Sequence, residues 1–244
     1  MKTDTLIFGI RAVLEALEAN KSIDKVFVQK GLSGSLFKEL EAELRKAKVN
    51  TVYVPIEKLN RLTTKNHQGV VAHISPVEFY VLEELVNSIL DSNATPLFLL
   101  LDQISDVRNF GAIIRTAECC GVHGIVIQKS GNAPINGDTV KTSAGAVFNI
   151  PICRVDHIKD AVFLLQASGI KIIAATEKAQ HSIFNVSLKE PCAIIMGSEG
   201  RGINPSVLKL ADSQAKLPMS GEIGSLNVSV AWGVFMYEAV RQRI

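Results

Sequence analysis

Apolar residues follow two different patterns along this chain. Up to residue 76, short apolar runs alternate with stretches in which apolar residues stand three and four positions apart, the spacing of a helix with one buried face. The expected strands are 26–28, 52–54 and 70–74, and the expected helices are 10–17, 36–47 and 59–63. These elements predict a small α/β sandwich in residues 1–76.

From residue 97 the apolar runs become longer and nearly continuous, and helical patterns separate them. The expected strands are 97–101, 124–127, 150–155, 170–175, 193–196 and 214–217, and the expected helices are 110–120, 139–147, 158–167 and a last one after residue 227. Continuous apolar strands that alternate with helices are typical of a parallel sheet that is buried on both faces. Residues 96–244 are therefore predicted to form a second α/β domain.

One amphipathic helix, 82–90, lies between the two regions, and Pro76 and Pro96 bracket it. Prolines on both sides of a short helix indicate a domain boundary. We therefore expect residues 77–95 to be a linker helix.

Composition places the chain among soluble globular proteins, because 47% of its 244 residues are hydrophobic and 20% are charged. No apolar run reaches the length of a membrane span, and residues 1–4 open no signal peptide, so the expected location is cytoplasmic. Residues 1–76 carry 12 basic and 8 acidic side chains, against 14 and 16 in the rest. That excess fits contact with RNA, and it fits ordinary solvated lysines equally well.

The four cysteines occupy positions 119, 120, 153 and 192, without a CxxC pair or the Cys/His spacing of a zinc site. We interpret all four as buried thiols and expect no metal.

Three segments in the second region combine a strand, a glycine-containing turn and the start of a helix. They are 99–115, 194–203 and 217–229. Such turns can hold a ligand, because glycine lets the backbone approach closely and a helix start offers free N–H groups, although the same pattern also occurs in ordinary strand-to-helix connections. The second turn reads G-x-x-G-x-G, not G-x-G-x-x-G, which disfavours a dinucleotide-dependent dehydrogenase.

These segments resemble the three motifs of the SpoU (TrmH-type) branch of the SPOUT RNA methyltransferases. N-x-G-x-x-x-R, MGxEGxG and LPM followed by SLNVSxA occur in that order between residues 97 and 244. Residues 8–13 and 67–70 are similar to members that 2′-O-methylate a guanosine of 23S ribosomal RNA. The resemblance implies a SPOUT-type parallel-sheet domain with a C-terminal trefoil knot, S-adenosylmethionine (AdoMet) bound in the knot, and a homodimer.

The resemblance also implies site residues. The AdoMet-binding positions are Gly197, Gly200, Leu217, Met219, Ser225 and Leu226, and the catalytic positions are Asn109, Arg115, Glu199 and Asn227. Family members use the arginine as general base for the 2′-hydroxyl, but a guanidinium with a pKa above about 12 is a poor base. A clamp on phosphate or hydroxyl is the alternative role for Arg115, and the sequence leaves both open.

Other polar residues have two interpretations. His67 in a polar loop fits an RNA contact or a structural turn, with contact slightly favoured, and Arg201 fits a phosphate clamp or an exposed turn and stays outside the predicted site. Glu199 is expected to cap the helix that follows it or to bond the arginine. In the last helix, Trp232 and a set of apolar residues suggest a dimer seam; the set is Val234, Phe235, Tyr237 and Val240.

The predicted function is AdoMet-dependent 2′-O-methylation of a guanosine in 23S rRNA, with RNA as partner. One alternative is the same chemistry on transfer RNA, and another is a non-catalytic RNA-binding or ribosome-assembly protein. The non-catalytic alternative is disfavoured because a binding module has no need to retain all of the residues Asn109, Arg115, Glu199, Ser225 and Asn227.

Overall fold

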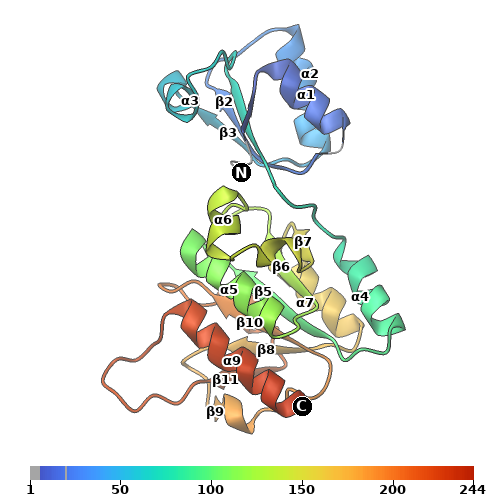
Figure 1. Cartoon of the computed structure of the whole chain (residues 1–244), viewed down its shortest axis with the longest axis vertical. Helices are drawn as coiled ribbons and strands as arrows, with labels where there is room; N and C mark the ends of the chain where they lie inside the picture. Colours follow the sequence, from blue (N-terminus) through green and yellow to red (C-terminus); the bar gives the residue numbers. More distant parts are fainter. Residues whose placement is uncertain (1–5, 20) are drawn as a thin grey trace. The chain divides into compact units, whose positions relative to one another are not determined.

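The computed structural model describes residues 6–19 and 21–244, so the expectation about residues 1–4 lies outside the described part. The chain divides into two compact units, which are drawn in Figure 1. Unit 1 contains the residues up to Glu78 together with Pro134–Gly137, and unit 2 contains Phe79–Ala133 and Asp138–Ile244.

Unit 1 is a four-stranded sheet in the order β1-β4-β2-β3, with helices on both faces. Its strands are β1 (Leu6–Phe8), β2 (Ile23–Gln29), β3 (Thr51–Val54) and β4 (Val70–Ile74), and its helices are α1 (Ile10–Glu18), α2 (Ser35–Lys46) and α3 (Ile56–Leu62). Helices α1 and α2 pack on one face, and α3 packs on the other through Leu59. The predicted sandwich is confirmed. The sequence pattern missed β1, which has only three residues.

Unit 2 contains a seven-stranded parallel sheet in the order β7-β6-β5-β10-β8-β11-β9. Its strands are β5 (Leu97–Asp102), β6 (Gly124–Gln128), β7 (Ile152–Val155), β8 (Lys171–Ala175), β9 (His181–Ser182), β10 (Cys192–Gly197) and β11 (Ser213–Lys216). All six residues of the interior strand β5 are buried. The predicted buried parallel sheet is therefore confirmed.

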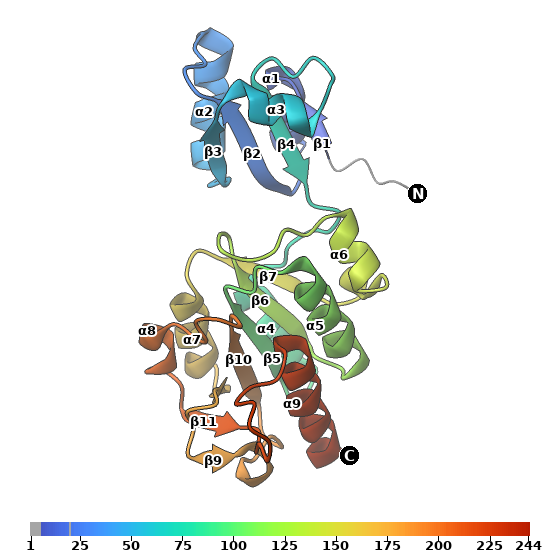
Figure 2. The same ribbon diagram turned by 90° about the vertical axis from the view of Figure 1, so that its left-hand side faces the viewer.

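Helices cover both faces of this sheet, as Figure 2 shows. On one side lie α4 (Leu82–Asp91), α7 (Ile158–Ala167) and α8 (Pro205–Leu208), and on the other lie α5 (Val107–Cys119) and α9 (Val228–Arg243). Helix α4 is not a free linker, because its Leu82, Val86 and Ile89 belong to the core that α7 also enters. Its apolar face is thus part of unit 2.

The predicted helix 139–147 is two short pieces, α6 (Gly137–Thr142) and the 3-10 turn η1 (Ala146–Phe148). Ala144 (φ 51°) and Gly145 (φ 85°) lie between them in the left-handed region, which ends a right-handed helix. Helix α8, strand β9 and the 3-10 turn η2 (Ile183–Asn185) were also absent from the sequence-based assignment. The trefoil knot stays a prediction, because strand order and pairing do not define a chain crossing.

The cysteine prediction is wrong for two of the four thiols. Cys119 is exposed and Cys120 is half-buried, because both lie where α5 ends. Cys153 and Cys192 are buried, and burial raises the pKa of Cys153 to about 12. Within residues 6–19 and 21–244, no helix is long and apolar enough to cross a membrane.

Candidate active site

Three polar side chains from distant segments meet beside the carboxyl ends of β5 and β10. Glu199, which follows β10, accepts hydrogen bonds at Oε1 from Asn109 Nδ2 (2.9 Å) and from Asn227 Nδ2 (2.8 Å). Asn227 Nδ2 also lies 3.0 Å from Asn109 Oδ1. Three of the four predicted catalytic residues thus form one cluster, the polar triad.

The hydrogen bonds also fix how the two amides are oriented. Asn227 is the N-cap of α9, and its Oδ1 accepts from the backbone N–H groups of Ser229 (2.9 Å) and Val230 (3.3 Å). Because Oδ1 must face those donors, Nδ2 faces Glu199. Asn109 Oδ1 then accepts from Asn227, and Asn109 Nδ2 donates to Glu199. The start of α9 therefore sets the donor directions of the whole triad.

Two aspartates hold the segments that carry the triad. Asp106 caps α5 by accepting from the backbone N–H groups of Arg108 (2.8 Å) and Asn109 (2.9 Å). Asp102, which is buried at the end of β5, accepts from Asn204 N at 2.7 Å and so ties the loop after β10 to β5. Burial raises the pKa of Asp102, and the bond from Asn204 opposes that shift.

The loop after β10 folds back on itself at its two outer glycines. Gly202 N donates to Ser198 O at 2.8 Å, and a Cβ on Gly197 would overlap the backbone of Gly202. Gly197 is therefore required for the turn itself. Helix α8 then begins at Pro205, and its N-cap is Asn204, so Glu199 does not cap the following helix as expected. Glu199 instead approaches the first N–H of α9, at Val228 (3.4 Å).

A cavity of about 970 Å³ lies between this loop and the segment that joins β11 to α9. All six predicted AdoMet-binding residues line it: Gly197, Gly200, Leu217, Met219, Ser225 and Leu226. Met196, Ala231 and Phe235 add apolar wall, and Glu199 and Asn227 lie in its lining as well. We call this the first cavity.

A second cavity, of about 520 Å³, adjoins the first. The two share the loop residues 198–201 and Val228 as lining. The rest of the second cavity comes from the turn after β5, the start of α5 and Gly131, and Asn109 is part of its wall. The triad therefore contributes side chains to both cavities, with Glu199 common to the two.

Arg115 does not join this cluster. It lies six positions after Asn109 on α5, which corresponds to roughly 9 Å along the helix axis and about 240° around it. Its side chain is exposed, lines neither cavity and has no hydrogen bond or ion pair with any described residue.

His67 is buried, and both of its ring nitrogens are used inside unit 1. Nδ1 accepts from Gly69 N (3.0 Å), so Nε2 carries the proton and donates to Asn60 Oδ1 (2.8 Å). The interpretation of His67 as an RNA contact is therefore wrong. The imidazole closes the turn before β4.

The last helix exposes fewer of the predicted seam residues than expected. Val234 and Tyr237 are exposed, but Phe235 is buried and Val240 is half-buried. Trp232 is fully buried, and its Nε1 donates to Ile113 O of α5 at 3.2 Å. Both residues thus pack inside their own chain: Trp232 lies against α5, and Phe235 lines the first cavity.

Sequence reasoning missed four polar residues of this region. Asp102 is the last residue of the buried strand β5 and Gln103 follows it. At this end of a parallel sheet side chains often reach a ligand, so this signal was available in the sequence. Arg201 was left out as an exposed turn, yet it lines both cavities. Lys178 lines the first cavity and lies outside the three motifs, so nothing in them pointed to it.

Comparison with known proteins decides the family. The model of the SpoU rRNA Methylase family matches residues 96–237, and a model described as RNA 2′-O ribose methyltransferase substrate binding matches residues 6–80. This chain belongs to the SpoU family. It is an RNA 2′-O-methyltransferase, its cofactor is AdoMet, and its partner is RNA.

Relatives cover nearly the whole chain. A putative TrmH family tRNA/rRNA methyltransferase of Bacillus subtilis, YacO, is 34% identical over 97% of this chain and 95% of its own length. The 23S rRNA (guanosine-2′-O-)-methyltransferase RlmB of Vibrio parahaemolyticus is also 34% identical, over 99% and 98%. Among solved structures, the SpoU methyltransferase AviRb of Streptomyces viridochromogenes in complex with AdoMet is 25% identical, with a TM-score of 0.58 over 98% of this chain and 90% of that one.

The first cavity fits the cofactor of this family. Its volume lies within the roughly 300–1,000 Å³ typical of small-molecule sites. A Cβ added at Gly200 or Gly224 would meet no atom within 4 Å, so both glycines border open space. Leu217 and Leu226 offer apolar walls for a ring, while the turns offer backbone donors and acceptors.

Proposed function

We propose that this SpoU enzyme 2′-O-methylates a guanosine of 23S ribosomal RNA. The target is supported by RlmB of Vibrio parahaemolyticus, which aligns over almost its full length. The name of YacO covers transfer and ribosomal RNA together, so a tRNA target is the second candidate. The observation that supports methyl transfer at this place is the polar triad, because its members line two adjoining cavities, one of which we assign to the cofactor and the other to the substrate.

When bound, AdoMet would supply a methyl group to the ribose 2′-hydroxyl: the oxygen would provide the electron pair of the new C–O bond, the pair of the broken C–S bond would stay on sulfur, and the hydroxyl would give up its proton. The work of the triad is to hold the hydroxyl and to receive its hydrogen bond. Glu199 uses Oε1 for both asparagine donors, which leaves Oε2 without a partner among the described residues. We assign to Glu199 Oε2 the acceptance of the hydroxyl hydrogen bond, and to Asn109 and Asn227 the orientation of Glu199.

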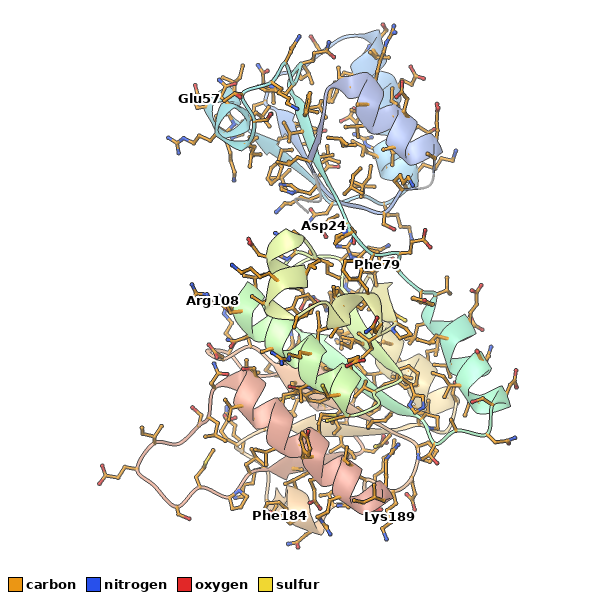
Figure 3. The ribbon with its side chains drawn as sticks, in the orientation of Figure 1. Asp24, Glu57, Phe79, Arg108, Phe184 and Lys189 are labelled. Atoms are coloured by element: carbon orange, nitrogen blue, oxygen red, sulfur yellow. The ribbon has the colours of Figure 1, made fainter. Side chains whose placement is uncertain are left out.

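A homodimer is the second part of the proposal. The side chains of Val230, Val234 and Tyr237 are exposed along α9, and Phe184, labelled in Figure 3, lines the same shallow surface. We define these four residues as the α9 surface. Burial of this surface against a second copy would remove apolar area from water.

A dimer also gives Arg115 a place in the reaction. Arg115 is exposed on α5, which packs directly against α9, and it reaches neither cavity of its own chain. A second copy docked on the α9 surface would approach α5 as well. We therefore propose that Arg115 acts on RNA bound at the dimer, as a phosphate or hydroxyl clamp.

Within unit 1 we propose a basic surface on the α3 side of the sheet as the RNA-binding face. Lys25 and Lys58 place Nζ 5.3 Å and 5.5 Å from the centre of the Phe27 ring, and Lys65 places Nζ 5.2 Å from that of Phe8. None of these three lysines has an acidic partner among the described residues. Three uncompensated cations on one face suit a phosphate backbone.

Mapping of ribose methylation tests the target. Ribosomal and transfer RNA from a strain without this gene should be compared with wild-type RNA by mass spectrometry of nuclease fragments. We expect one 2′-O-methylguanosine to disappear from 23S rRNA and to return when the purified enzyme and AdoMet are added. Loss of a methyl group from transfer RNA alone would select the tRNA alternative, and unchanged RNA would reject both.

A further inference from the structure

Among the described residues, three charged side chains line the second cavity, Asp106, Glu199 and Arg201, and they differ in whether they already have hydrogen-bond partners. Asp106 already accepts two backbone N–H groups, and Glu199 already accepts from both asparagines. Arg201 is the one basic residue in the lining, and its guanidinium has no hydrogen bond or ion pair within the described residues. The cavity thus offers a free cation a few residues from the triad.

Gln103 is held in place on the other side of this cavity. Its backbone has a φ of 63°, an uncommon value for a residue other than glycine. The neighbouring Ile104 fixes it, because Ile104 N donates to Asn132 Oδ1 (3.1 Å) and Ile104 O accepts from Ala133 N (2.7 Å). The side-chain amide of Gln103 has no partner among the described residues, so its donor and its acceptor are both available.

We propose that the second cavity binds the target nucleotide of the RNA, with Arg201 on the phosphate next to the reacting ribose and the Gln103 amide on the base. A guanidinium is matched to a phosphate because it can donate two parallel hydrogen bonds. The cavity volume of about 520 Å³ suits one nucleotide. This inference rests on the proposed methyl transfer at the triad and adds the residues that choose and position the substrate.

Because Arg201 also lines the first cavity, it could instead contact the cofactor. The two roles differ in what they predict for AdoMet affinity. An arginine on the RNA phosphate leaves AdoMet binding unchanged, whereas an arginine on the AdoMet carboxylate is needed for it.

The test compares the full-length variants Arg201→Gln, Gln103→Met and Arg108→Gln. Gln103→Met keeps the length of the side chain and removes its hydrogen-bonding groups. Arg108→Gln is the control, because Arg108 is exposed at the start of α5, is labelled in Figure 3 and lines neither cavity. For each protein, AdoMet affinity is measured by calorimetry, and kcat and KM are measured on a fragment of the RNA that wild type methylates.

We expect Arg201→Gln to raise KM for RNA roughly tenfold, to reduce the salt dependence of RNA binding by about 0.7 in log-log slope, and to leave AdoMet affinity within about twofold. Gln103→Met should raise KM several-fold without a change in that slope, since it removes no charge. The control should match wild type in every measurement.

Two results overturn this inference while the proposed function stands: unchanged RNA kinetics in both variants, or a loss of AdoMet affinity in Arg201→Gln. Failure of the proposed function appears separately, as a wild-type protein that methylates no ribose in any RNA offered. Circular dichroism checks whether a variant has a lower unfolding temperature than wild type. If Arg201→Gln does, Arg201→Lys separates loss of stability from loss of a phosphate contact, because lysine keeps the charge and should recover at least half of the salt slope.

Discussion

The polar residues singled out in unit 1 and in unit 2 differ in where their hydrogen-bond partners come from. In unit 2, Asn109 on α5, Glu199 after β10 and Asn227 at the start of α9 are far apart in the sequence and bond one another beside two cavities. In unit 1, His67 is bonded within eight residues of the chain and is buried. The hydrogen-bonding groups of His67 are both used by its own turn, so none is left for a substrate. The groups of the triad are instead brought together by segments that are far apart in the sequence, and this is how the fold assembles a site.

Removal of unit 1 should have the largest effect on RNA methylation. The residue at which the shortened chain begins decides whether unit 2 still folds. A chain that begins at Phe79 keeps both cavities and α4, so it should fold and bind AdoMet like the full protein. Methylation of RNA by this chain should fall below detection, because the basic surface of unit 1 is gone. Radiolabelled methyl transfer and calorimetry measure the two properties.

A chain that begins at Thr95 is the matched comparison. It lacks Leu82, Val86 and Ile89, whose burial stabilises the core of unit 2. Loss of one such side chain costs about 2–5 kcal/mol, and a domain has only about 5–15 kcal/mol in total. We expect this shorter chain to be unfolded or aggregated. If it is as stable as the chain from Phe79, then α4 is a linker after all.

Asn227→Asp tests the triad with the next largest effect. Aspartate is as good an N-cap as asparagine, so α9 should keep its start. The exchange removes the Nδ2 donor and places a second carboxylate beside Glu199, and kcat should fall by roughly two to four orders of magnitude. Single-turnover methyl transfer at saturating AdoMet measures the change.

Asn227→Ser is the control for charge, since serine caps the helix without adding a carboxylate. Its loss of kcat should be smaller than that of Asn227→Asp. Equal unfolding temperatures of the two variants and the wild type would show that the cap survives. Wild-type rates in Asn227→Asp would remove the triad from the mechanism.

The sequence predicted more of unit 2 than of the details that make its site work. Continuous apolar runs such as 97–101 indicated the strands, because a strand with no polar side chain must be buried on both faces. The motif resemblance indicated which side chains would meet. Neither could place Arg115, whose direction depends on the helix turn, or Arg201, whose environment depends on how its loop folds back over Gly197. The left-handed break at Ala144 likewise has no local sequence signal beyond the glycine that follows it.

In unit 1, nothing in the sequence separates His67 from the lysines as a candidate RNA contact, whereas the structure does so, because His67 is buried and bonded within its own turn. The variant Lys25→Gln/Lys58→Gln/Lys65→Gln should lower RNA affinity and make its log-log salt dependence less steep by about 2, because each lost phosphate contact removes about 0.7 to 0.9. His67→Gln should leave that dependence unchanged. It should instead lower the free energy of unfolding by about 1–3 kcal/mol, through loss of its two hydrogen bonds.

The control for the lysine variant makes the same charge change on α2, which covers the opposite face of the sheet. It replaces Lys38, Arg45 and Lys46 with Gln. Filter binding at several salt concentrations compares the RNA affinity of the wild type, the lysine variant and this control. An equal change of slope in the control would mean that unit 1 attracts RNA by net charge and has no preferred face.

The smallest expected effect is on the stability of unit 2, which should fall at low pH because of a carboxylate near the end of α9. Glu238 is buried and accepts from Arg241 Nε and Nη2, both at 2.8 Å, and from Gln242 Nε2 at 2.7 Å. These bonds, led by those of Arg241, lower the pKa of Glu238 from 4.5 to about 2. Gln242 in turn holds Leu188 N at 2.7 Å, so the carboxylate helps to fix the last turn of the chain.

Because the folded-state pKa of Glu238 lies below its unfolded value, its contribution to stability is complete above about pH 4.5 and is lost as the pH falls towards 2. Wild type should therefore exceed Glu238→Gln in unfolding temperature at pH 7, and the difference should narrow between pH 5 and pH 3. Asp102, whose pKa is shifted the other way, is present in both proteins, so its effect cancels in this comparison. Calorimetric scans of the chain from Phe79, made at steps of half a pH unit, isolate unit 2. A difference that stays constant down to pH 3 would mean that the charge of Glu238 adds nothing and that only its packing matters.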